Sequence, residues 1–253
     1  MDGTAIGAGR LIVATGTKPV VPPIEGLADG PFLTSEMVWD LTRAAASLLV
    51  LGVEAAARLL GQEEPAASEV IARVFKRDGI ELRLGAKAVR VRYPAPDTVR
   101  VELDDGSILD AQHLLVAVGR TPVTEGLGLE SAGVGRDERG FIRTDERMAT
   151  SAPGVFAAGD VTGRLLFTHA ADEMGRIAGN ALRWPMRRRF RAESKPWVIF
   201  TRPEVARVGL TEAETAGRGG RIAYLPMTEV DRAIAVGVTD GFVTTRSLLW
   251  PSC

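Results

Sequence analysis

The stretch from Val155 to Ala181, VFAAGDVTGRLLFTHAADEMGRIAGNA, limits the fold of this chain more than any other. Val155–Ala158 is a short apolar run typical of a buried strand, and Gly159-Asp160 ends it. From Thr168 onward, apolar residues recur at steps of three and four, which predicts a helix with one buried face. The residues of that face are Ala170, Ala171, Met174, Ile177, Ala178 and Ala181. The stretch therefore predicts a strand, a turn and a helix in direct succession.

The turn at Gly159-Asp160 has the chemistry of a binding site. A glycine lets the backbone approach a ligand closely, a carboxylate accepts hydrogen bonds from hydroxyl groups, and a helix start offers free N–H groups. These groups suit a ligand that carries both a polyol and a polar ring. The alternative is an ordinary strand end, because aspartate is common in turns. The residues of the turn alone leave both interpretations open.

A family resemblance favours the binding site. AAGDVTG followed by THAADEMG resembles the second flavin-contacting motif of the pyridine nucleotide–disulfide oxidoreductases, which include dihydrolipoamide dehydrogenase, glutathione reductase and mercuric reductase. The resemblance implies that Gly159 and Asp160 hold the ribityl chain of FAD. It also implies contacts between the flavin ring and the segment Leu166, Phe167, Thr168 and His169. Further matching pieces occur in the family's order from Gly3 to Val243.

The first of these pieces is VATGTKPVVPPIEGL, which follows a predicted strand over Arg10–Thr15. It resembles the ATG motif, where the family's chain leaves the flavin domain, and this implies that Ala14, Thr15 and Gly16 contact the cofactor. Its prolines predict an extended connector. The residues from Thr34 to Leu41 then predict a short capped helix.

The region that should bind the nicotinamide cofactor departs from the family pattern. SLLVLG at 47–52 resembles the first strand of the nicotinamide domain, yet VEAAARLLG follows it where a GxGxxG turn is expected. The resemblance places Glu54 at the position of the acid that faces the adenosine ribose, whereas the alternative is a solvated helix residue. A GxGxxG turn binds diphosphate through free N–H groups at a helix start. Tight NAD(P) binding is therefore not expected.

Regular patterning resumes at Pro65. An amphipathic helix is predicted from Pro65 to the residue before Asp78. Strands are predicted over Ile80–Leu84, Lys87–Tyr93 and Val99–Leu103, with a hairpin turn at Asp105-Gly106. A buried strand over Leu114–Val118 then leads into GRTP, and VAVGRTP resembles the exit from the nicotinamide domain. This implies that Gly119 packs against the nicotinamide. Arg120 is either a surface arginine that bridges two domains or a ligand contact.

The last third of the chain resembles a connector and an interface domain. RWPMRRRFR at 183–191 combines arginines with aromatic residues, which suits either an interdomain connector or a nucleic acid or acidic partner. We expect the connector, and nucleic acid is not an expected partner. A strand is predicted to start at Trp197. Phe200–Thr215 resembles the opening of the family's dimerisation domain, through which members form homodimers. The match ends after Val243, so we expect an incomplete interface.

Composition excludes several classes of function. The 253 residues contain 31 basic and 32 acidic side chains, so no net charge draws the chain to nucleic acid or membrane. No run reaches the roughly 20 apolar residues of a membrane span, and the N-terminus lacks a signal-peptide pattern. We therefore expect a cytoplasmic protein. The single cysteine, Cys253, and two histidines, His113 and His169, predict neither a disulfide framework nor a metal site.

Strand-like and helix-like segments alternate as in doubly wound proteins. With the resemblance, this predicts an α/β fold of incomplete FAD- and NAD(P)-binding doubly wound (Rossmann-like) domains, plus the start of an α+β dimerisation domain. The predicted segments are the end of the first FAD-domain segment with its connector (1–45), a truncated NAD(P)-binding domain (46–122), the second FAD-domain segment (123–192) and a partial dimerisation domain (193–253).

The resemblance implies an FAD-dependent pyridine nucleotide–disulfide oxidoreductase that passes electrons from NAD(P)H through FAD. The family's CxxxxC pair, both GxGxxG turns and the C-terminal His–Glu pair find no match, so we expect impaired catalysis and assign no catalytic residue. FAD binding is expected to be weak or absent. The alternatives are an inactive fragment and a protein-binding module. The electron acceptor, and the choice between NADH and NADPH, stay open.

Overall fold

The structure is a computed structural model that describes residues 7–52, 57–181 and 188–247. Contacts divide the chain into two compact units, each built from segments that are far apart in the sequence. The first unit comprises Met1–Pro23, Pro31–Gly52 and His113–Lys195. The second comprises Ile24–Gly30, Val53–Gln112 and Pro196–Cys253. The chain thus crosses between the two units several times.

A parallel pair of short strands forms the centre of the first unit. β1 (Leu11–Val13) pairs with β10 (Val155–Ala157) in a register that places Leu11 opposite Val155. Both strands were predicted. Because they are parallel, their carboxyl ends lie side by side, where the turn after β10 begins. Apolar side chains from these strands and from the following loops form one core cluster: Val13, Leu129, Val134, Ile142, Ala152, Ala157 and Val161.

Two further sheets belong to the first unit. β8 (His113–Val116) lies between β3 (Leu33–Thr34) and β4 (Leu48–Leu51), and all three strands are parallel. Leu114 and Val116 of β8 are fully buried, as predicted for this strand. β2 (Thr17–Pro19) pairs antiparallel with β9 (Arg120–Pro122). This last pair brings the ATG segment beside the GRTP segment.

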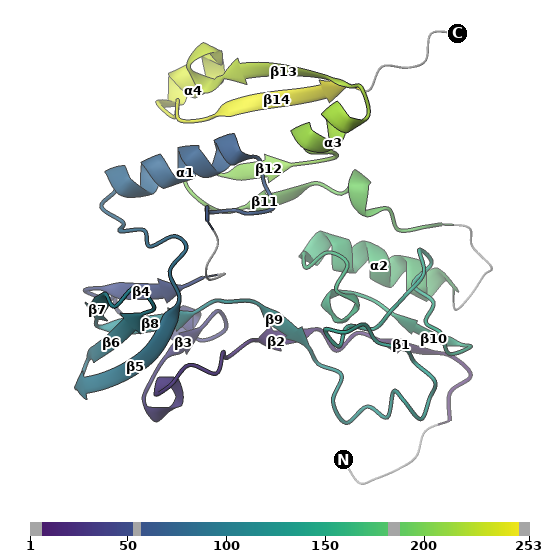
Figure 1. Ribbon diagram of the computed structural model, residues 1–253. Coiled ribbons are helices and arrows are strands. Elements are labelled where there is room, and N and C mark those ends of the chain that lie inside the picture. Colours follow the sequence, from purple (N-terminus) through teal and green to yellow (C-terminus); the bar gives the residue numbers. More distant parts are fainter. Residues whose placement is uncertain (1–6, 53–56, 182–187, 248–253) are drawn as a thin grey trace. The chain divides into compact units, whose positions relative to one another are not determined.

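Helix α2 (Thr168–Ala181) contacts β10 and confirms the helix predicted from periodicity (Figure 1). Its buried positions are Ala170, Met174, Ile177 and Ala178. They recur at helical spacing because one face of the helix packs into a second core cluster. That cluster also contains Met148, Ala158 and Phe190. Short 3-10 turns complete the unit at Val38–Asp40, Asp160–Thr162 and Ala192–Ser194.

The second unit contains α1 (Pro65–Arg77) and a three-stranded antiparallel sheet. Pro65 occupies the first turn of α1, where its missing N–H costs nothing, and Ser68, Val70, Ile71 and Val74 are buried. The sheet consists of β5 (Ala88–Ala95), β6 (Thr98–Leu103) and β7 (Ile108–Ala111). A 3-10 turn at Leu27–Asp29 contacts β5.

The C-terminal part of the second unit consists of two hairpin-like pairs and two short helices. β11 (Trp197–Ile199) pairs with β12 (Val205–Arg207), and β13 (Arg221–Pro226) pairs with β14 (Phe242–Ser247). α3 (Glu212–Gly217) lies between the two pairs in the sequence. A 3-10 turn at Met227–Glu229 and α4 (Asp231–Val236) connect β13 to β14. The strand predicted to start at Trp197 is confirmed.

Two buried carboxylates tie this part to the start of α1. Glu63 accepts hydrogen bonds from Nε of Arg207 and Nε1 of Trp197, each over 2.9 Å. Glu64 pairs with Arg246 over 2.6 Å. Because a buried charge without a partner is costly, these ion pairs set the arrangement of segments within the unit.

The predicted strand over Ile80–Leu84 is wrong. The N–H of Ile80 donates to the carbonyl oxygen of Phe75 over 2.8 Å, so it closes the end of α1 instead of joining a ladder. Ile80 and Leu84 remain 48% and 43% exposed. An alternating pattern forms a strand only when another strand supplies hydrogen-bond partners. The three strands of the sheet accordingly run over 88–111, whereas the three predicted strands spanned 80–103.

The short helix predicted after Thr34 is also only partly present. Oγ1 of Thr34 accepts from the N–H of Glu36 over 3.3 Å, which makes a local turn. A 3-10 turn over Val38–Asp40 follows, without an α-helix. Hydroxyl groups near a helix start also stabilise such turns, so the capping signal alone does not decide between them.

Candidate functional site

The turn after β10 carries the carboxylate singled out by the sequence. The N–H of Ala158 donates to the carbonyl oxygen of Val13, so the ends of β1 and β10 stay side by side. Gly159 follows with φ +77°, and a Cβ added there would stand 3.4 Å from Cβ of Ala171 on α2. Glycine therefore lets the turn pack directly against the first turn of the helix.

Asp160 is half-buried and lies at the start of a 3-10 turn. Its Oδ2 accepts a hydrogen bond from Oγ1 of Thr17 over 3.2 Å. Among the described residues, Thr17 is the one hydrogen-bond partner of this carboxylate, so Oδ1 is available to a ligand. Thr162 closes the turn because its hydroxyl donates to the carbonyl oxygen of Gly159 over 2.8 Å. The turn thus presents a carboxylate from a fixed backbone.

The start of α2 lies next to this turn. Ala171 donates to the carbonyl oxygen of Phe167 over 2.9 Å, so the N–H groups of the three residues before it have no acceptor within the helix. Thr168 and His169 are exposed, and Leu166 is 41% exposed. The rings of Phe167 and His169 stack at 5.7 Å. The predicted ring-contacting segment therefore offers apolar surface beside backbone donors that have no acceptor within the helix itself.

The ATG residues lie in the same unit and are held by the opposite segment. Ala14 and Thr15 are exposed. Oγ1 of Thr15 donates to the carbonyl oxygen of Val123 over 2.6 Å, and the N–H of Val123 donates to the carbonyl oxygen of Gly16 over 3.0 Å. These bonds fix the chain immediately before Thr17, the partner of Asp160.

The predicted nicotinamide residues are less completely placed. Gly119 is exposed in the first unit, and its carbonyl oxygen accepts from the N–H of Val20 over 3.0 Å. Glu54 lies outside the described residues. The structure therefore brings together the predicted flavin residues, whereas Gly119 alone represents the nicotinamide side.

Motif reasoning missed Thr17 as a site residue and left Arg120 undecided. Nε of Arg120 donates to Oγ1 of Thr17 over 2.6 Å, so the arginine contacts the partner of Asp160. The signal that could have found Thr17 is its place directly after Gly16, where a hydroxyl follows the end of a strand.

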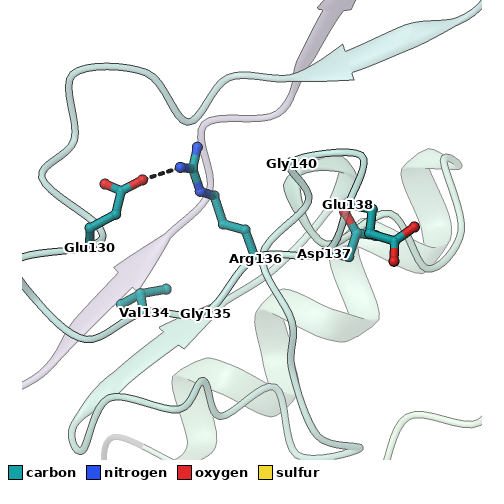
Figure 2. Close-up of a pocket in the computed structure, with 7 residues that line it drawn as sticks. All are labelled: Glu130, Val134, Gly135, Arg136, Asp137, Glu138 and Gly140. Carbon is teal, nitrogen blue, oxygen red and sulfur yellow. Dashed lines mark hydrogen bonds and ion pairs between the residues drawn. The ribbon is translucent and has the colours of Figure 1, made fainter.

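A surface depression elsewhere in the first unit is no better candidate for a ligand site than the turn at Asp160. It measures about 530 Å³ and is lined by Glu130, Val134, Gly135, Arg136, Asp137, Glu138 and Gly140 (Figure 2). Arg136 forms an ion pair with Glu130. Asp137 accepts from the N–H groups of Arg139 and Phe141, each over 2.9 Å. The charged groups of Glu130, Arg136 and Asp137 are therefore already engaged with neighbouring protein groups.

The described ranges contain no group of three or more His, Cys, Asp or Glu side chains that could hold a metal ion. Among the helices of the described residues, none is long and apolar enough to cross a membrane.

Comparisons with known proteins point to one family. The sequence profile described as "Pyridine nucleotide-disulphide oxidoreductase" matches residues 33–175, and the profile of that family's dimerisation domain matches residues 195–245. The chain is 36% identical to a dihydrolipoyl dehydrogenase of Thermus scotoductus, over 96% of this chain and 58% of the relative. It is 35% identical to a mercuric reductase of Streptomyces lividans, over 95% of this chain and 56% of the relative.

Solved structures agree with the sequence comparison. The HOCl-induced flavoprotein disulfide reductase RclA of Escherichia coli superimposes with a TM-score of 0.85 at 28% identity, over 94% of this chain and 60% of that protein. This likeness confirms the predicted fold class. The chain spans less than two thirds of the length of these relatives.

Proposed function

The chain belongs to the pyridine nucleotide-disulphide oxidoreductase family, and from this membership we propose that its first unit holds the ribityl chain and ring of FAD in an NAD(P)H-dependent flavoprotein. The relatives named as dihydrolipoyl dehydrogenase, mercuric reductase and flavoprotein disulfide reductase support this reaction class. A cytoplasmic location is part of the same proposal.

The observation that carries the proposal is the placement of Asp160. Its carboxylate stands at the carboxyl end of a parallel strand pair, where ligands of doubly wound proteins bind. One oxygen is held by Thr17, and the other can accept a hydrogen bond from a ribityl hydroxyl. Close packing of Gly159 on Ala171 sets the carboxylate beside the start of α2. These groups fit a flavin.

Each part of the site has a role that its chemistry allows. Bound FAD supplies a ring that accepts hydride and passes electrons onward. Asp160 binds and orients the ribityl chain, and the first N–H groups of α2 donate to the polar edge of the ring. Leu166 and Phe167 cover apolar parts of the ring and exclude water. None of these residues transfers a proton in the proposal.

We further propose that these 253 residues by themselves bind FAD weakly and do not complete the reaction. These 253 residues contain no GxGxxG sequence, and the stretch between β4 and α1 has glycines only at 52 and 61. The diphosphate groups of FAD and of NAD(P) therefore lack the N–H groups that such a turn provides. One cysteine, Cys253, cannot form a dithiol pair within the chain.

The test is a flavin titration of wild type and Asp160→Ala, followed by quenching of flavin fluorescence. Loss of a hydrogen bond to a charged group costs about 1.5–3 kcal/mol, so we expect the Kd for FAD to rise about 10- to 150-fold. Asp172→Asn is the control, because Asp172 lies on the exposed side of α2 and pairs with Arg176. Equal affinities for wild type and Asp160→Ala would contradict the proposal.

A specific observation supports a second role as a protein-binding module. Residues 195–245 match a dimerisation domain, and several apolar side chains of α4 and of the β13–β14 pair are exposed: Ile222, Tyr224, Leu225, Ile234, Val236 and Val243. We propose that this surface associates with a second family chain. Sedimentation at increasing concentration tests the role, and a monomer at all concentrations, also for a mixture with a full-length relative, would count against it.

A further inference from the structure

A row of hydrogen-bonded side chains joins Arg120 on β9 to Asp160 through Thr17 on β2. Nε of Arg120 donates to Oγ1 of Thr17 over 2.6 Å, and Oγ1 of Thr17 contacts Oδ2 of Asp160 over 3.2 Å. All three residues belong to the first unit. We infer that Thr17 and Arg120 are positioning residues that orient the Asp160 carboxylate toward the ribityl chain, an inference that rests on the proposed flavin site.

The direction of each hydrogen bond follows from the chemistry of the groups. A guanidinium group donates and cannot accept, so Oγ1 of Thr17 must be the acceptor from Arg120. The hydroxyl has one proton of its own to donate. An ionised carboxylate only accepts, so this proton points to Oδ2 of Asp160. Arg120 thereby determines where the hydroxyl proton of Thr17 lies.

Further contacts hold Arg120 in the orientation that this requires. Nη2 of Arg120 also donates to the main-chain oxygen of Thr17 over 2.8 Å, so the guanidinium binds this residue at two points. On its other side, the guanidinium contacts Oγ of Ser35 over 3.2 Å and Oε1 of Glu36 over 3.1 Å. Glu36 is 58% exposed, so the ion pair adds little free energy and mainly sets direction. Lysine cannot donate from two separate nitrogens and would not reproduce this geometry.

The consequence for a ligand is preorganisation. With Oδ2 bound to Thr17, the carboxylate of Asp160 is held in one orientation before the flavin arrives. Without Thr17, binding would have to immobilise the carboxylate, and an immobilised side chain lowers affinity by roughly three- to tenfold. This loss should affect only ligands that carry a ribityl chain.

The experiment compares riboflavin with lumiflavin, which has the same ring but no ribityl chain. We expect Thr17→Val and Arg120→Lys to raise the Kd for riboflavin roughly three- to tenfold and to leave the Kd for lumiflavin unchanged. Thr17→Ser keeps the hydroxyl and should restore wild-type affinity. Lys18→Met is the matched control, because Lys18 lies on the same strand and pairs with exposed Glu125. Thr17→Val should add no loss to Asp160→Asn, since Thr17 acts through Asp160.

Equal losses for both flavins, or additive losses in the double variant, would overturn the inference in favour of a purely structural role. A second measurement needs no flavin: the NMR signal of the Arg120 Nε–H should shift in Thr17→Val and stay in place in Thr17→Ser. If wild type binds neither flavin, the proposed function fails. The NMR signal of Arg120 Nε–H then still tests whether Arg120 and Thr17 are hydrogen-bonded. An Nε–H signal unchanged by Thr17→Val would disprove it.

Discussion

Gly163 ends the turn that presents Asp160, and its surroundings leave no space for a side chain. It has φ +66°, and a Cβ added there would stand 2.7 Å from Cγ of the buried ring of Phe141. Gly175 on α2 differs, because no atom lies within 4 Å of an added Cβ. Substitution by alanine is therefore expected to change the free energy of unfolding in opposite directions at Gly163 and Gly175.

We expect Gly163→Ala to lower the free energy of unfolding by about 1–3 kcal/mol, since the new methyl group must displace the ring of Phe141. Gly175→Ala should raise it by about 0.4–1 kcal/mol, because alanine restricts the unfolded chain and suits a helix. Urea denaturation followed by circular dichroism measures both changes. Two variants with the same unfolding midpoint would show that the turn adapts to a side chain.

The short helix α3 begins with a reciprocal side-chain cap. Oγ1 of Thr211 accepts from the N–H of Glu214 over 3.2 Å, and the Glu214 carboxylate accepts from the N–H of Thr211 over 2.7 Å. The backbone N–H of Thr211, and after it the hydroxyl, lower the pKa of Glu214 below its ordinary value of 4.5. The reciprocal cap ties the helix start to the ionised form of one side chain.

A lowered folded-state pKa gives stability that is present above the unfolded value and is lost as the pH falls through the folded value. We therefore expect the amide protection factors in α3, taken relative to the intrinsic exchange rate at each pH, to fall as the pH drops below about 4.5. Glu214→Gln should remove this pH dependence, and Thr211→Ala should cost about 1 kcal/mol of local stability at neutral pH. An acid response that persists in Glu214→Gln would assign it to other carboxylates.

At the scale of the whole molecule, the proposed flavin groups all lie in the first unit, whereas the dimerisation-domain match lies mainly in the second. Cys253 lies outside the described residues, and His113 lies in β8. The described residues contain no cysteine. The described part of the chain therefore shows no dithiol that could accept electrons from a flavin at the proposed site.

We expect these 253 residues to show no NADH- or NADPH-dependent reduction of disulfides or mercuric ion, even with FAD in excess. Hydride transfer needs both cofactors held in contact, and dithiol chemistry needs two cysteines. Stopped-flow absorbance of the flavin band measures the first step, and steady-state NADPH oxidation measures turnover. Cys253→Ala should change neither. Turnover that this substitution abolishes would make the terminal cysteine a redox centre.

Much of the local structure could be predicted from sequence. The limits of α1 follow from Pro65 and from Asp78-Gly79, and the buried face of α2 follows from its apolar spacing. Such signals depend on residues within a turn or two of each other, so no tertiary information is needed to interpret them. Asp160 and the segment 166–169 were found by resemblance to a motif. Their roles, like the division into four segments, stay predictions.

The tertiary structure alone decided which distant residues meet. Thr17 and Asp160 are 143 positions apart, and they touch because β1 pairs with β10 and β2 pairs with β9. Tertiary packing also explains why the predicted strand at Ile80–Leu84 is absent: the N–H of Ile80 donates to the carbonyl oxygen of Phe75 in α1. Local pattern sets which face of a segment is apolar, but a backbone donor or a side-chain hydroxyl takes whichever acceptor the packing brings within about 3 Å. For this chain, the sequence determined most of the elements and the turn that carries Asp160, and packing determined which distant residues Asp160 contacts.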